Sequence, residues 1–324
     1  MKALFIQPRR LGDVLMTTPS VRAFKKAHPD AVLDYMVSDA CAAAIQYNPY
    51  ISAVVSADGS FAAVAARVRR GGYDAVVDFM SIPKTALVSL FSKAGIRSGF
   101  ARGVRGFLYS HPVAHSGARC YAAMEKARLL APLSIPVDDW NLELFSGPGE
   151  AVAIHALATR LGLDQRTRTI AFSPVSRRAY KRWPAERYAL VCDRLRERFG
   201  CDFLPVCGPG EEPAVEQVIA ACRHKEAFMY PYPLVSFTGL VHLLPFCCMY
   251  FGNDNGIRHA AILCGLPTAT VFGRPDPLCW TPSGSALHTF VWGREDIESL
   301  PDDAVTDMAV RTLAHACAHT GARS

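Results

Sequence analysis

Residues 251–273 read FGNDNGIRHAAILCGLPTATVFG, and this segment decides the fold of the chain. It predicts a short buried strand, a polar turn, a helix over 257–264 and a second buried strand. Asn and Asp at 253–255 are typical of turns and N-caps, and Gly256 leaves room where the chain turns. A helix start presents unpaired N–H groups that favour an anion. The segment therefore predicts a phosphate site, although an ordinary capped helix fits the same residues equally well.

Strands and helices alternate along most of the chain, which indicates βα units and parallel sheets. The predicted strands are 2–7, 32–37, 53–56, 75–80, 142–145, 169–172, 202–207 and 249–251. The predicted helices include 14–27, 40–46, 61–70, 84–93, 121–130, 151–161, 184–199 and 304–318. Ligands of such sheets bind at the carboxyl ends of the strands. The pattern predicts an α/β fold class with two Rossmann-like, doubly wound parallel-sheet domains facing a central cleft.

The turn-rich segments 146–150 and 161–168 are the candidate domain boundaries. We place the first domain at 1–160 and the second at 161–300. The last helix, within 301–324, is predicted to pack back on the first domain.

The composition is that of an ordinary soluble protein: 324 residues, of which half are hydrophobic and a fifth are charged. No apolar run approaches the roughly 20 residues that span a bilayer. The N-terminus lacks the features of a signal peptide, and the 11 cysteines are scattered without metal-ligand spacing. We therefore expect a cytoplasmic protein with free, mostly buried thiols.

Positive charge is concentrated in the first half of the chain. Residues 1–150 carry 17 Lys and Arg against 12 Asp and Glu, whereas the remainder carries 18 against 17. An anionic partner or surface for the first half is one interpretation, and a solvated basic face is the other. The basic segment 95–106, GIRSGFARGVRG, is predicted to be a flexible loop that either binds acidic groups of a substrate or serves as a connector.

The sequence lacks the motifs of several other nucleotide-dependent enzymes. The glycine fingerprint of a dehydrogenase should follow the first strand, where residues 7–13 read QPRRLGD. The chain has no Walker A loop, no HExxH and no GxSxG. It also has no Asp-x-Asp pair for a metal on a diphosphate, so a nucleotide would need protein cations and helix dipoles. We expect no nucleic-acid partner.

Four separated motifs, in order, resemble glycosyltransferase family 9, the lipopolysaccharide heptosyltransferases. They are LGDVLMTTP (11–19), SRRAYKRWPAERY (176–188), CGPGEE (207–212) and the opening segment 251–273. The residues YDAVVDFM (73–80) and the Asp276, Pro277 and Trp280 element fit the same register. The resemblance implies the GT-B architecture, with acceptor bound by the first domain and a nucleotide-sugar donor, usually ADP-heptose, by the second. It also implies inverting transfer without an obligatory metal and without any other cofactor.

The resemblance also implies functional roles for particular residues. Asp13 matches the general base, although capping the helix that follows would also explain it. Lys181 matches the lysine that stabilises the leaving diphosphate. The remaining donor-binding candidates are Ser176, Glu211 (or Glu212) at the ribose, Asp254, Asn255, Gly256 and His259. The candidates for acceptor binding are Arg9, Arg10, Arg97, Arg102 and Arg105.

The chain departs from the family pattern near the phosphates. Arg177 and Arg178 follow Ser176 where threonines are common, and Ile257 stands where proline is frequent. The expected activity is transfer of a heptose to a lipopolysaccharide core or similar anionic glycolipid, with peripheral contact at the inner membrane. The alternatives are another nucleotide sugar used on a small-molecule or protein acceptor, or an inactive nucleotide-sugar-binding relative.

Overall fold

The computed structural model describes residues 1–101, 103–165, 168–176 and 178–320. The chain forms two compact units, Met1–Phe145 and Ser146–Ser324. The division therefore lies about fifteen residues before the predicted boundary at 160. The physical reason is that helix α6 (Glu150–Arg160) packs in the second unit, where its Ile154 and Ala158 join an apolar core with Leu240 and Leu243.

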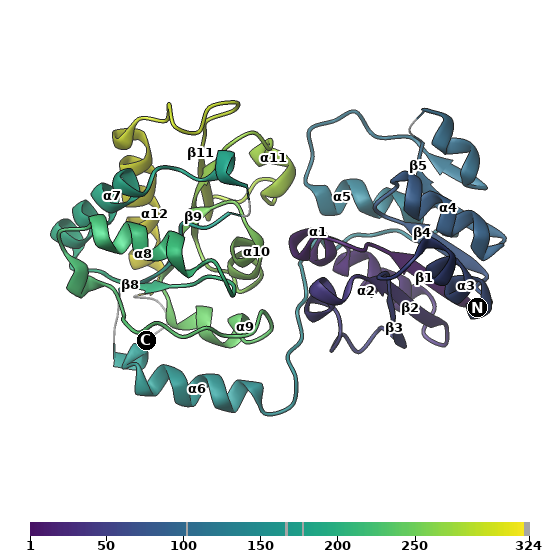
Figure 1. Cartoon of the computed structure of the whole chain (residues 1–324), viewed down its shortest axis with the longest axis horizontal. Coiled ribbons are helices and arrows are strands. Elements are labelled where there is room, and N and C mark those ends of the chain that lie inside the picture. Colours follow the sequence, from purple (N-terminus) through teal and green to yellow (C-terminus); the bar gives the residue numbers. More distant parts are fainter. Residues whose placement is uncertain (102, 166–167, 177, 321–324) are drawn as a thin grey trace. The chain divides into compact units, whose positions relative to one another are not determined.

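The first unit is a parallel sheet of six strands in the order β3-β2-β1-β4-β5-β6, with helices on both faces (Figure 1). Its elements are β1 (Lys2–Ile6), α1 (Leu11–Leu15), α2 (Thr18–Ala27), β2 (Val32–Val37), η1 (Asp39–Ala44), β3 (Ala53–Ser56), α3 (Phe61–Gly71), β4 (Ala75–Asp78), α4 (Pro83–Ser92), β5 (Ile96–Phe100), η2 (Gly103–Leu108), β6 (His111–Val113), α5 (Ala122–Ala127) and η3 (Arg128–Leu133).

Strand β1 lies inside this sheet and is apolar on both faces, as its sequence predicts. Leu4 and Ile6 point into a core shared with α3 and α4. Phe5 points to the opposite face and contacts Phe24 of α2 edge-on, with 5.3 Å between the ring centroids. This alternation places helices on both sides of the strand.

Three local predictions in the first unit are wrong. The predicted loop 95–106 contains strand β5 and the turn η2, because Ile96 and Phe100 supply enough apolar surface to extend the sheet despite the glycines. Residues 142–145 form no strand. The predicted helix 14–27 is two helices, α1 and α2, and Pro19 lies in the first turn of the second, where a missing N–H costs nothing.

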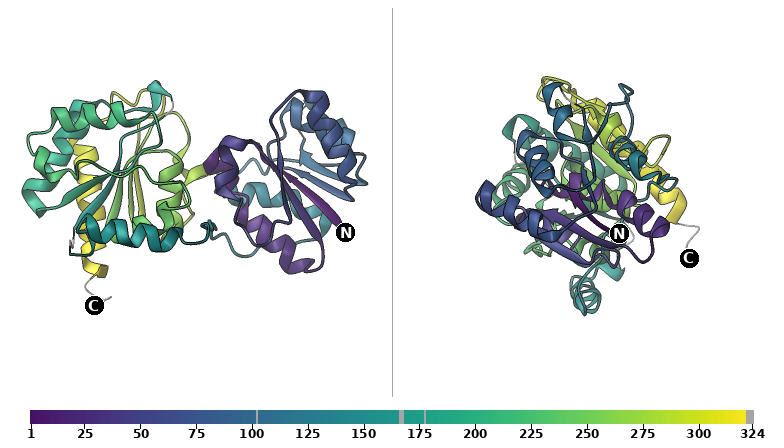
Figure 2. Two further views of the ribbon diagram at one scale, coloured as in Figure 1. Left: turned by 60° about the horizontal axis from the view of Figure 1, so that its bottom comes forward. Right: turned by 90° about the vertical axis from the view of Figure 1, so that its right-hand side faces the viewer.

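The second unit is a parallel sheet of five strands in the order β11-β10-β9-β7-β8. Helices cover both faces of this sheet (Figure 2). After α6 its elements are η4 (Leu163–Gln165), β7 (Thr169–Ser173), η5 (Ala179–Lys181), α7 (Ala185–Phe199), β8 (Asp202–Pro205), α8 (Glu212–Ala221), η6 (Lys225–Ala227), α9 (Leu240–Leu243), η7 (Leu244–Phe246), β9 (Met249–Asn253), α10 (Gly256–Leu263), β10 (Thr268–Phe272), α11 (Pro277–Trp280), β11 (His288–Trp292) and α12 (Asp302–Thr320).

Two apolar layers cover the two faces of this sheet. One contains α7 and α12, with Trp183 buried among them, and the other contains α6, α9 and α10. The last helix, α12, packs against α7, β10 and β11 of its own unit. This corrects the prediction that the C-terminal helix returns to the first domain, and the reason is that Val305, Met308 and Leu313 complete the apolar core beside those strands.

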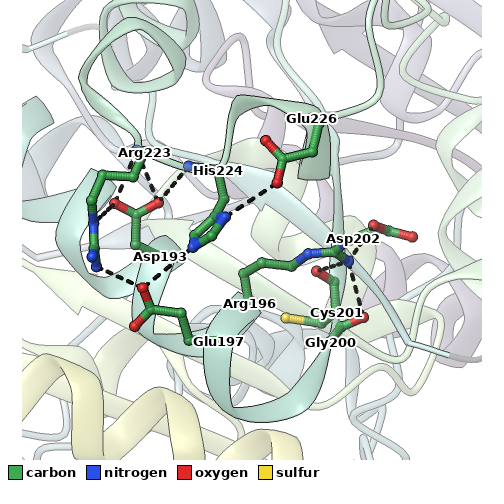
Figure 3. Close-up of polar contacts among 9 residues, drawn as sticks. All are labelled: Asp193, Arg196, Glu197, Gly200, Cys201, Asp202, Arg223, His224 and Glu226. Carbon is green, nitrogen blue, oxygen red and sulfur yellow. Dashed lines mark hydrogen bonds and ion pairs between the residues drawn. The ribbon is translucent and has the colours of Figure 1, made fainter.

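A polar cluster fixes the connection after α8 to helix α7 (Figure 3). The buried carboxylate of Asp193 accepts hydrogen bonds from the backbone N–H groups of Arg223 and His224. The His224 ring contacts Glu226 and Glu197, and hydrogen bonds with both carboxylates raise the pKa of His224.

Among the described residues, no helix combines the length and apolar character needed to cross a bilayer.

Candidate active site

The strand order of the second unit has a switch point between β7 and β9. From β7 the chain moves to β8 on one side and then crosses to β9 on the other. The carboxyl ends of strands at such a point diverge and bind ligands in α/β sheets. Residues 174–176 follow β7 and residues 254–256 follow β9, so the segments predicted to hold the diphosphate lie at this point.

The turn after β9 is fastened to the end of β7. Asn255 is the N-cap of α10, and its side-chain oxygen accepts the N–H of Arg258 at 3.1 Å. Its amide group donates to the Ser173 hydroxyl and to the Val175 carbonyl, both at 3.0 Å. One side chain therefore caps the helix and joins the two strand ends.

Gly252 permits the close approach of these strands. A Cβ atom at this position would lie 2.0 Å from the Ser173 carbonyl oxygen. Any side chain would push β7 and β9 apart at the place where their ends form the site. The glycine is thus required by the contact and not by the turn that follows it.

Lys181 reaches the same turn from the segment after β7. Its Nζ lies 3.8 Å from a carboxylate oxygen of Asp254, and its backbone carbonyl accepts the amide of Asn253 at 2.7 Å. Asp254 also faces the guanidinium of Arg258 at 3.9 Å. The structure brings Lys181, Asp254, Asn255 and Gly256 together, as the sequence predicts.

His259 is buried one turn into α10. Burial, and then the charges of Arg258 and Lys181, lower its pKa to about 3, so the ring is neutral at physiological pH. Its Nδ1 has no hydrogen-bond partner among the residues that the structure describes. The ring of Trp280, which is only half-buried, lies 6.1 Å away.

Arg258 is a site residue that the sequence analysis did not select. Its side chain is fully buried and donates to the Thr270 hydroxyl, the Trp280 carbonyl and the Thr281 hydroxyl. The arginine therefore ties α10 to β10 and to the segment after α11. Its place in the first turn of the predicted helix, close to Asp254, was the available signal.

Two other residues predicted to bind the nucleotide-sugar donor lie at the same edge of the sheet. Ser176 is buried, and its carbonyl accepts the Nε of Arg182 at 2.6 Å. Glu211 accepts the backbone N–H of Gly208 at 3.0 Å, so its carboxylate closes the turn after β8. Glu212 is the first residue of α8. The contact with Gly208 fixes the orientation of the Glu211 carboxylate.

In the first unit the switch point lies between β1 and β4. Asp13 follows β1 in the short helix α1, and its carboxylate accepts the N–H of Arg10 at 3.4 Å. The nearly buried Lys126 of α5 lies 3.6 Å from the other oxygen of Asp13 and donates to Gln7 at 2.7 Å. Lys126 is a second residue that the sequence analysis missed, because 113 positions separate it from Asp13.

The end of β4 is fixed by a buried carboxylate. Asp78 accepts hydrogen bonds from the N–H groups of Met80 and Ser81 and from the hydroxyl of Tyr109. Burial raises the pKa of Asp78, and these donors oppose that shift. Asp78 therefore shapes the loop that faces the end of β1.

The predicted acceptor arginines are only partly brought together. Arg9 and Arg10 lie in the exposed segment between β1 and α1. Arg97 belongs to strand β5. Its guanidinium donates a 2.7 Å hydrogen bond to the carbonyl of Ala94, three residues earlier in the chain. Arg102, and the side chain of Arg105, lie outside the described residues.

The family model and the relatives with similar sequences indicate one family. The model of Glycosyltransferase family 9 (heptosyltransferase) matches residues 61–302. Lipopolysaccharide heptosyltransferase 3 of Escherichia coli is 21% identical over 307 residues, which are 90% of this chain and 88% of the relative.

Solved structures extend the similarity to the whole fold. A family 9 glycosyl transferase from Veillonella parvula has a TM-score of 0.80 at 20% identity, with 97% of each chain covered. Escherichia coli heptosyltransferase WaaC, solved with ADP, has a TM-score of 0.72 at 19% identity and covers 98% of this chain and 99% of its own. The two Rossmann-like units thus have the GT-B fold.

Proposed function

Because the chain belongs to glycosyltransferase family 9, the heptosyltransferase family, we propose that it transfers a heptose from ADP-heptose to a lipopolysaccharide core. The family match over residues 61–302 is the observation that carries this proposal. The names of the relatives support the acceptor class, and the ADP in the similar heptosyltransferase structure supports the nucleotide.

The donor diphosphate binds at the N-terminus of α10 in this proposal. The N–H of Arg258 is taken by Asn255, which leaves the N–H groups of Gly256 and Ile257 to face the phosphates. Lys181 exchanges its contact with Asp254 for a phosphate oxygen. Asp254, an anion, then accepts hydroxyl groups of the sugar.

His259 serves this site as a neutral ring. A group with a pKa of about 3 carries no charge at neutral pH, so it can donate one hydrogen bond without changing the net charge. Glu211 accepts the ribose hydroxyls, and the buried Ser176 lines the neighbouring strand end. Positive charge from Lys181 and the helix dipole makes a metal unnecessary for departure of the diphosphate, and no other cofactor takes part.

Asp13 acts as the general base in the proposed reaction. The acceptor hydroxyl oxygen attacks the anomeric carbon and forms the new glycosidic bond, while its proton passes to the Asp13 carboxylate. The bond between the anomeric carbon and the diphosphate oxygen breaks, with inversion, and ADP leaves with the electron pair. Lys126 is a positioning residue, because its charge holds the carboxylate in one orientation.

A thermal-shift screen of ADP, GDP, UDP and CDP tests the donor. A ligand at a hundred times its dissociation constant stabilises the folded state by about 2.7 kcal/mol, which raises the melting temperature by on the order of 5 °C. We expect a shift with ADP and much smaller shifts with the others. A preference for another nucleotide would overturn the ADP-heptose assignment, and no response to any nucleotide would contradict the transferase proposal.

A further inference from the structure

The outer face of helix α4 is unusually apolar. Its inward face buries Ala86 and Val88 together with the small polar residues Thr85, Ser89 and Ser92. Its outward face carries Leu87, Leu90 and Phe91, which are 36%, 38% and 50% exposed. A helix on the surface of a soluble domain normally carries polar or charged side chains on its outward face. The outer face of α4 is therefore poorly suited to contact with water.

The neighbouring helix α3 extends this apolar surface. Helices α3 and α4 pack side by side on the first unit (Figure 1). The ring of Phe61, at the start of α3, meets the ring of Phe91 edge-on at 5.7 Å and is 37% exposed. We name Phe61, Leu87, Leu90 and Phe91 the outer patch. A contiguous exposed group of large apolar residues marks an interaction surface.

Helices α3 and α4 carry four basic residues and no acidic one. The exposed acidic residues Asp58 and Asp74 lie in the segments before and after α3. Exposed cations occupy the two helices of the patch and their ends: Arg69, Arg70, Lys84 and Lys93. The patch is therefore apolar at its centre and basic along its helices.

We propose that the outer patch docks the first unit on an anionic lipid bilayer. The apolar side chains enter the boundary between headgroups and acyl chains, and the basic side chains meet the negative headgroups. Each cation near such a surface contributes about 1 kcal/mol, or roughly a fivefold change in affinity. Apolar insertion and charge attraction together give binding that is reversible and sensitive to salt.

A second copy of the chain fits the outer patch less well. Two-fold association places the same surface on both partners. Arg69 and Arg70 of α3 and Lys84 and Lys93 of α4 would then approach the same cations of the partner, which costs affinity. An anionic bilayer complements both the apolar centre and the charge.

This inference extends the proposed function, since a lipid-linked acceptor would be met at the same membrane, but its test needs no sugar transfer. Flotation of the full-length protein is measured with vesicles of phosphatidylcholine alone and with a quarter phosphatidylglycerol. We expect flotation with the anionic vesicles only, and its loss at high salt.

Variants separate the two contributions. Leu87→Gln with Phe91→Gln removes the apolar anchor and should reduce affinity by on the order of tenfold. Lys84→Gln with Lys93→Gln should reduce it by about 25-fold if the two charges act independently. The matched control is Val152→Gln, because Val152 is 75% exposed but belongs to α6 of the second unit. Unchanged circular dichroism and melting temperature verify folding.

Three results would overturn the inference. They are absence of flotation, equal flotation of wild type and Phe91 variant, and a solution dimer that becomes monomeric when the outer patch is substituted. Retained transfer to a water-soluble acceptor by the non-floating variant distinguishes loss of docking from loss of catalysis.

Discussion

Asp254 is held between two cations, with Lys181 at 3.8 Å and Arg258 at 3.9 Å. The two cations are not equivalent. Arg258 is fully buried and hydrogen-bonded to groups on two other segments, so it is a fixed part of the framework. Lys181 is partly exposed, and its ammonium group can turn to a ligand. We therefore expect Lys181, and not Arg258, to meet the diphosphate.

Lys181→Met should weaken ADP binding without unfolding the second unit. A hydrogen bond to a charged group contributes about 1.5–3 kcal/mol, which corresponds to a loss of roughly 10- to 100-fold in affinity. Isothermal titration calorimetry measures it, with Lys225→Met as a control because Lys225 is an exposed cation in η6. Equal affinity of wild type and Lys181→Met would remove Lys181 from the diphosphate site.

Lys126 is expected to affect turnover and not donor binding. Lys126→Met removes the cation beside Asp13 and should lower kcat by about tenfold or more, the scale of one charged hydrogen bond. Lys126→Arg should restore part of the rate because it restores the charge. A purely structural lysine would instead give variants that lose melting temperature together with activity.

Sequence reasoning found the site residues that sit within motifs and missed those that complete the site from elsewhere. Lys181 lies within the motif at 176–188, and the turn at 254–256 directly follows a recognisable strand. Lys126 lies in a helix with no motif and reaches Asp13 only through folding. Long-range pairing of this kind has no local signal, because neither propensity nor periodicity depends on it.

At the scale of elements, the contact between β7 and β9 positions the turn of α10. Gly252→Ala would place a methyl group 2.0 Å from the Ser173 carbonyl. We expect a loss of about 1–3 kcal/mol in unfolding free energy, as for other overpacked sites, together with weaker ADP binding. Chemical denaturation measures the first effect.

Gly95→Ala is the matched control for that variant. Its added Cβ would meet no atom closer than 3.9 Å. If both variants unfold at the same denaturant concentration, the close approach of the two strands is not what requires glycine at position 252.

Two buried histidines make the second unit sensitive to acid. Burial, and then the charge of Arg258, lower the pKa of His288 in β11 to about 4. The pKa of His259 is lowered to about 3. Between these values and the unfolded pKa of about 6.5, only the unfolded chain binds the protons. Stability present at neutral pH is therefore lost as the pH falls below about 6.5.

For each histidine the expected loss between pH 7.5 and pH 5 is about 2 kcal/mol of unfolding free energy. His288→Asn should remove its share and leave a shallower pH dependence, which denaturation at the two pH values measures. Identical slopes for wild type and variant would show that His288 does not titrate on unfolding.

The sequence predicts most elements because the parallel strands are continuous apolar runs, and β1, β2 and β9 are found where expected. It fails where the pattern is weak. Strand β5 contains a glycine, and β11 has mixed polarity at the edge of its sheet. Such strands exist because a neighbouring strand offers hydrogen bonds, which is a tertiary effect.

On the scale of the whole molecule, the two units divide the proposed work. The donor residues, from Ser176 to His259, all belong to Ser146–Ser324, and the proposed base belongs to Met1–Phe145. Each site lies at the switch point of its own sheet. Donor binding and proton removal should therefore be separable by substitution.

Asp13→Asn tests this division most directly. Heptose transfer from ADP-heptose to a core acceptor is measured beside ADP binding on the same preparation. General base catalysis contributes about 10²- to 10⁴-fold, so transfer should fall by that factor while ADP affinity stays within about twofold. Transfer at the wild-type rate by Asp13→Asn would contradict the account.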